Sequence, residues 1–81
     1  MFKLKAENGS NNYCGKNLAR IRLAQHPPLS QRGLAKKLQL MGYDVDYYFI
    51  RRVETGERFV TDIELKMLAK ALNVSYEELI D

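Results

Sequence analysis

One cysteine and one histidine are the residues of this 81-residue chain that could carry out nucleophilic catalysis. Cys14 and His26 could form a thiolate pair, in which the imidazole takes the thiol proton. The sequence around Cys14 offers no group to orient such a pair, so an incidental cysteine and a solvent-facing histidine at a helix end are the preferred interpretation. Two such residues also cannot supply the roughly four ligands of a zinc site at any familiar spacing. We therefore expect no metal.

Other catalytic patterns are missing from the sequence. It contains no Gly-rich phosphate loop, no Gly-x-Ser-x-Gly and no pair of histidines around a carboxylate, so we expect neither an enzyme nor a cofactor. A lone cysteine excludes a disulfide framework and favours a reducing cytoplasm. No apolar run approaches the roughly 18 to 20 residues that span a bilayer. Met1–Lys5 has no apolar stretch after its basic residues, so we expect no signal peptide. The formal net charge of +3 favours an anionic partner.

The segment from Asp46 to Glu54 carries the most informative side chains. At about 100° per residue, Phe49, Ile50 and Val53 share one face of a helix, and two tyrosines and two arginines lie opposite or beside it. These four residues are Tyr47, Tyr48, Arg51 and Arg52. Guanidinium groups can bind guanine edges or phosphates, and phenol rings can contact a thymine methyl group. The alternative is an ordinary solvated helix face, but two large exposed aromatics favour a contact surface.

Five helices must position these side chains. Apolar spacing and capping residues predict them at 16–25, 30–41, 46–54, 61–73 and 75–80. Their short connections predict a compact all-α domain over residues 15–81. Residues 1–14 are expected to be a flexible N-terminal arm, because 6–12 are polar and turn-prone, although Phe2 and Leu4 alternate with lysines as an edge strand would.

Three patterns occur in order along most of the chain. They are Leu29-Ser30-Gln31-x-x-Leu34-Ala35-x-x-Leu38, Ile50-x-x-Val53-Glu54-x-Gly56-x-Arg58, and Leu65-x-x-Leu68-Ala69-Lys70-Ala71-Leu72-Asn73-Val74. Together they resemble the lambda-repressor-like (Cro-type, or xenobiotic-response-element) helix-turn-helix family over about residues 15 to 80. The resemblance implies a five-helix domain whose helix 30–41 crosses the DNA backbone and whose helix 46–54 enters the major groove.

The family resemblance also implies a function and roles for particular residues. We expect a sequence-specific regulator of transcription, from a prokaryote or phage, that binds double-stranded DNA as a homodimer and represses by occlusion. Gln31, Arg32 and Arg58 would hold phosphates, and Arg22 would form a structural ion pair with Glu54. From the residues themselves, we also expect Lys3 and Lys5 to contact flanking DNA as a basic arm, and Leu79 and Ile80 to form the exposed apolar contact of the dimer.

The sequence departs from the family pattern in two places. The turn before the recognition helix carries about five extra residues, 39–43, and the helix opens with Tyr47-Tyr48 where shorter side chains are usual. An alternative from another class is a protein-interaction module of the same fold, such as an antitoxin. It would bind its partner through Tyr43, Tyr47 and Tyr48.

Overall fold

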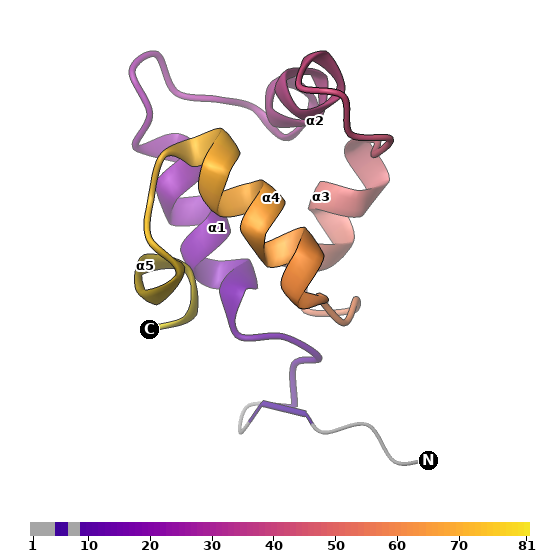
Figure 1. Ribbon diagram of the computed structural model, residues 1–81. Coiled ribbons are helices and arrows are strands. Elements are labelled where there is room, and N and C mark those ends of the chain that lie inside the picture. Colours follow the sequence, from indigo (N-terminus) through magenta and orange to yellow (C-terminus); the bar gives the residue numbers. More distant parts are fainter. Residues whose placement is uncertain (1–4, 7–8) are drawn as a thin grey trace.

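The computed structural model describes residues 5–6 and 9–81 of the chain. Five α-helices follow one another in this part (Figure 1). They are α1 (Cys14–Leu23), α2 (Gln31–Leu40), α3 (Tyr47–Glu54), α4 (Asp62–Leu72) and α5 (Tyr76–Ile80). The predicted all-α class is confirmed for these residues. The strand considered at Phe2–Leu4 lies outside them. None of the helices in the described residues combines the length and apolar character that a membrane span requires.

Side-chain caps fix where four of the helices begin. The Ser30 hydroxyl accepts from the amide of Gly33 at 2.9 Å, and the Asp46 carboxylate accepts from the amide of Phe49 at 3.1 Å. Thr61 and Ser75 each begin a helix with a complete capping box, in which the third helical residue is a glutamate that accepts from the cap backbone. The predicted starts of α2 to α5 agree with these caps.

The first helix differs from its prediction of 16–25, because it begins at Cys14 and ends at Leu23. Tyr13, the residue before it, makes no side-chain cap. Instead Asn12 Oδ1 accepts from the amide of Gly15 at 2.8 Å. Asn12, one residue before the usual capping position, thus provides the acceptor for an otherwise unpaired amide of the first turn. This contact allows the helix to begin two residues earlier than the apolar spacing indicates.

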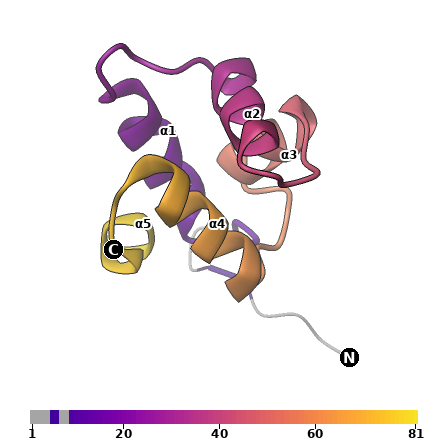
Figure 2. The same cartoon turned by 45° about the horizontal axis from the view of Figure 1, so that its top comes forward.

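One apolar core joins the five helices. α3 packs against α1 and α2, and α5 packs against α1 and α4, so that α2 and α3 lie opposite α5 in both views (Figures 1 and 2). The side chains with no exposed surface come from every helix, namely Leu18, Leu34, Leu38, Ile50, Val53, Leu68 and Leu79. The prediction that Leu79 forms an exposed dimer contact is therefore wrong. Its neighbour Ile80 is 43% exposed.

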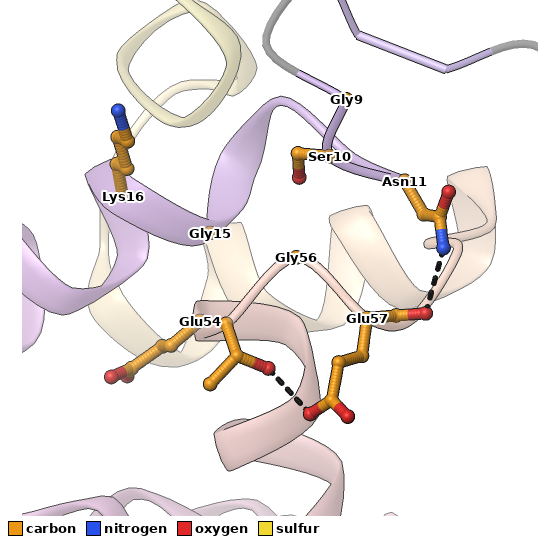
Figure 3. A pocket seen from close by; sticks show the side chains of 9 residues that line it. Gly9, Ser10, Asn11, Gly15, Lys16, Glu54, Gly56 and Glu57 are labelled. Atoms are coloured by element: carbon orange, nitrogen blue, oxygen red, sulfur yellow. Dashed lines mark hydrogen bonds between the residues drawn. The ribbon is translucent and has the colours of Figure 1, made fainter.

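Residues 10–12, assigned to the arm from their composition, are bonded to the segment that follows α3. The Asn11 amide donates to Gly56 O, and its side chain donates to Glu57 O, both at 2.9 Å (Figure 3). Gly56 has a φ of +80°, and a Cβ atom there would collide with the hydroxyl of Ser10. The close approach of these two segments therefore requires glycine at position 56. Lys5 is exposed, and Lys3 lies outside the described residues.

Candidate nucleic-acid interface

The α3 helix turns three of the four predicted contact residues toward solvent. Phe49, Ile50 and Val53 are buried, as the helical spacing predicts. On the other side Tyr48 is 55% exposed, and Arg51 and Arg52 are exposed, whereas Tyr47 is half-buried. This face therefore carries one free phenol and two guanidinium groups.

The segment between α2 and α3 is folded into the domain although it is longer than the family pattern. The Tyr43 amide donates to Leu38 O at 3.0 Å, past Gly42 with its φ of +96°, and the Gln39 side chain donates to Val45 O at 2.9 Å. Met41, Tyr43 and Val45 pack against the core. The extra residues are thus fixed to the end of α2 by hydrogen bonds and to the core by apolar contacts.

Arg32 links the first turn of α2 to the start of α3. Its guanidinium carbon lies 4.5 Å from the centroid of the Tyr47 ring. Tyr47 in turn meets Tyr48 edge to face, with 5.2 Å between ring centroids. Arg32, Tyr47 and Tyr48 therefore form a continuous row across the junction of the two helices.

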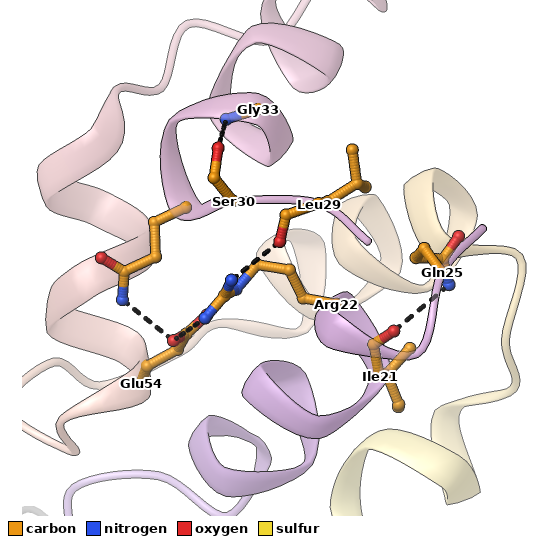
Figure 4. A network of polar contacts seen from close by, with 8 residues as sticks. Ile21, Arg22, Gln25, Leu29, Ser30, Gly33 and Glu54 are labelled. Atoms are coloured by element: carbon orange, nitrogen blue, oxygen red, sulfur yellow. Dashed lines mark hydrogen bonds and ion pairs between the residues drawn. The ribbon is translucent and has the colours of Figure 1, made fainter. Parts of the chain in front are cut away.

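A buried polar network lies behind this row and includes the predicted ion pair. Arg22 donates to both carboxylate oxygens of Glu54, and its remaining Nη1 donates to Leu29 O at 2.8 Å (Figure 4). Gln31 Nε2 also donates to Glu54, at 2.9 Å. The amide nitrogen expected to reach a phosphate is thus bonded to Glu54 inside the domain. Spacing along the sequence gives no signal for this contact.

Arg58, the third predicted phosphate contact, is also occupied within the domain. Its Nη2 forms an ion pair with Glu64, and its guanidinium carbon lies 4.9 Å from the centroid of the Phe49 ring. Partial burial would raise the pKa of Glu64. The hydrogen bonds from the Thr61 backbone and Arg58 outweigh this effect, so the pKa is lowered. Arg58 therefore braces the start of α4 against α3.

Sequence reasoning missed Asn12, which connects α1 to the far end of α3. Its Nδ2 donates to Val53 O at 3.1 Å and to Arg58 O at 2.8 Å. A polar segment containing two adjacent asparagines is typical of a loop, and both of these acceptors are more than 40 residues away in sequence. Only the assembled fold brings them together.

The one cysteine is unsuited to nucleophilic chemistry. Cys14 is buried, and loss of solvation raises the pKa of its thiol to about 11, helped by the charge of Glu64. Cys14 opens α1 and His26 lies beyond its other end, roughly 14 Å away along a helix of this length. The thiol therefore cannot use His26 as its base. No cluster of metal-binding side chains occurs in the described residues.

An open hollow of about 440 Å³ lies on another side of α3, between its end and the start of α1 (Figure 3). Its walls include Gly9, Gly15, Lys16 and Thr55. The Thr55 hydroxyl donates to the Glu57 carboxylate at 2.7 Å, so two of the polar groups here are bonded to each other. The row on α2 and α3 remains the stronger candidate site.

Comparisons of the chain with protein-family models, with curated proteins and with solved structures found no match. The helix-turn-helix resemblance therefore stays a prediction.

Proposed function

We propose that this chain is a sequence-specific, double-stranded DNA-binding regulator of transcription, in which α2 and α3 act as a helix-turn-helix. The observation that supports it best is the outer face of α3, where Tyr48, Arg51 and Arg52 are exposed opposite the buried apolar side chains. Within the described residues the guanidinium groups of Arg51 and Arg52 have no hydrogen-bond or ion-pair partner. Both are thus available to an external anion.

The chemistry of this face matches the major groove of DNA. That groove is about 12 Å wide and admits one helix. Arginine can donate two parallel hydrogen bonds to the O6 and N7 atoms of guanine, and a phenol ring can contact the thymine methyl group. In this proposal Arg51, Arg52 and Tyr48 face bases, and repression follows from occlusion of the site.

The phosphate contacts in this proposal are concentrated on α2. Gln31 and Arg58 each have an intramolecular partner, so they support α3 more than they offer free donors. Arg32 is exposed and keeps its donors, and Lys36 and Lys37 are exposed on the same helix. A duplex lying across the first turns of α2 would therefore meet positive charge.

We place the homodimer contact on the α4–α5 side, in place of Leu79. Ile63, Tyr76 and Ile80 are 76%, 49% and 43% exposed there. Ile63 and Tyr76 line one hollow with Asp62 and Lys66, so a two-fold partner can set the acid of one copy against the base of the other. The two α3 helices would then contact half-sites about one helical turn apart.

Selection from random duplexes at moderate salt tests the DNA-binding proposal. The expected result is an enriched pseudo-palindromic motif, with loss of its preference in Arg51→Ala and Arg52→Ala. Lys16→Ala is the matched control, because Lys16 is exposed at the start of α1, on the wall of the hollow described above, and belongs to neither the α3 face nor the proposed dimer contact. The proposal fails if no motif is enriched and residual DNA binding is the same in all three variants. A protein-interaction module would give that result.

A further inference from the structure

The contact between Arg32 and Tyr47 has a geometry that holds the arginine without using its donors. The guanidinium carbon lies 4.5 Å from the ring centroid, within the range of a cation–π interaction. The guanidinium carbon lies over the ring, so the contact is with the π face of Tyr47, and arginine has five N–H donors for other partners. Within the described residues this ring is the only partner of the Arg32 side chain. Its hydrogen-bonding edge is therefore free.

Tyr47 is itself held in place. It is half-buried at the first residue of α3, directly after the cap Asp46, and the Tyr48 ring meets it edge to face. A long, exposed arginine normally loses side-chain entropy when it binds, and a fixed partner reduces that loss. The Tyr47 ring therefore holds Arg32 in advance of binding.

The position of Arg32 and Tyr47 favours contact with a phosphate over contact with a base edge. Arg32 belongs to the first turn of α2, whereas the outer face of α3 carries Arg51 and Arg52. The amide nitrogen of the neighbouring Gln31 is bonded to Glu54. Arg32 is thus the side chain of this turn that keeps free charged donors beside the helix N-terminus, where a phosphate is favoured.

We propose that Arg32 and Tyr47 act as one unit, in which Tyr47 positions the Arg32 guanidinium for a bidentate contact with a single backbone phosphate of DNA. This inference rests on the proposed DNA-binding function and adds different roles for the two adjacent tyrosines. Tyr47 is a positioning residue, whereas its neighbour Tyr48 faces bases. A change in the contact between Arg32 and Tyr47 should alter the affinity for all DNA sequences alike, because a phosphate carries no sequence information.

The test measures the affinity for a mixed-sequence duplex of about two helical turns over a range of salt concentrations. Log affinity falls with log salt, and Arg32→Ala should make this fall less steep by about 0.9, the value for one phosphate. Tyr47→Leu keeps an apolar side chain but removes the ring, and should weaken binding about two- to tenfold and shift the slope toward that of Arg32→Ala. Tyr47→Phe should stay within about twofold of the wild type, because it keeps the π face.

The double variant Arg32→Ala/Tyr47→Leu decides whether the two residues act together. It should bind as Arg32→Ala does, because the ring has nothing left to position. Additive losses, or a Tyr47→Leu protein with wild-type affinity and salt slope, would overturn the inference while leaving DNA binding intact. Tyr13→Leu, at the exposed residue that precedes α1, is the control for loss of an exposed aromatic. A wild-type chain that binds neither this duplex nor any selected one would instead overturn the proposed function and this inference with it.

Discussion

Arg22 on α1 and Glu54, the last residue of α3, are joined by two parallel hydrogen bonds. Nε donates to Oε2 at 2.8 Å and Nη2 donates to Oε1 at 2.9 Å, and the two side chains are only 10% and 7% exposed. The same groups also bond to Leu29 and Gln31 at the start of α2. One ion pair therefore fixes three helices relative to one another.

Removing the carboxylate should destabilise the fold strongly. Glu54→Ala leaves the Arg22 guanidinium buried without its partner, which costs about 3 kcal/mol or more. The melting temperature of a domain of this size should fall by about 12 °C or more. Glu57→Ala is the control, because Glu57 is exposed and bonds only to Thr55 through its side chain, and should change stability by less than about 0.5 kcal/mol. Equal shifts of the two variants in thermal denaturation would contradict this role of Glu54.

The features that the sequence predicts are those set by neighbours along the chain. The caps Ser30, Asp46, Thr61 and Ser75 each bond to an amide three residues ahead, so local patterns locate these helix starts. Periodicity likewise predicts which face of α3 is buried.

The features that the sequence misses depend on tertiary placement. Asn12 bonds to carbonyl groups at the end of α3, and no local rule connects such distant positions. Gln31 and Arg58 look like free cationic or amide donors in the sequence, but packing brings each of them against a glutamate. The residue types of the candidate site could be predicted, whereas their partners could not.

Asn12 should contribute as much to stability as a core contact. Asn12→Ala removes donors to Val53 O and Arg58 O and the acceptor of the Gly15 amide, and leaves these groups partly buried without partners. Such unsatisfied groups cost about 1 to 3 kcal/mol each in principle, and a total loss of about 2 kcal/mol or more is expected in urea denaturation. Asn11→Ala, which removes one exposed hydrogen bond, should cost about 1 kcal/mol or less. A reversed order would show that Asn12 does not hold α1 to α3.

The hydrogen bonds that Glu64 accepts from the Thr61 backbone and from Arg58 should make the fold sensitive to acid. The pKa of Glu64 is lower in the folded chain than its ordinary value of 4.5, so unfolding takes up a proton. Its contribution to stability is complete above that value and is lost as the pH falls through the folded pKa. The melting temperature of the wild type should therefore drop more steeply than that of Glu64→Gln between about pH 5 and about pH 3. Glu77→Gln, a change at an exposed residue of α5, should follow the wild type, and parallel curves for all three proteins would contradict the assignment.

Tyr48 should matter for the choice of DNA sequence in the proposed function. Its ring is 55% exposed on the outer face of α3, one residue beyond the Tyr47 ring that holds Arg32. Tyr48→Ala removes a side chain able to contact a base, and one good base contact is worth about 1 to 3 kcal/mol of discrimination. Affinity for the selected duplex should therefore fall about fivefold or more, with little change for a mixed-sequence duplex. Where the selected site contains thymine, replacing it with uracil should weaken the wild type but not Tyr48→Ala, because only the wild type can contact the methyl group. Tyr13→Ala, which removes an exposed ring just before α1, should leave both affinities unchanged. Equal losses on the two duplexes in Tyr48→Ala would assign the Tyr48 ring to the phosphate backbone.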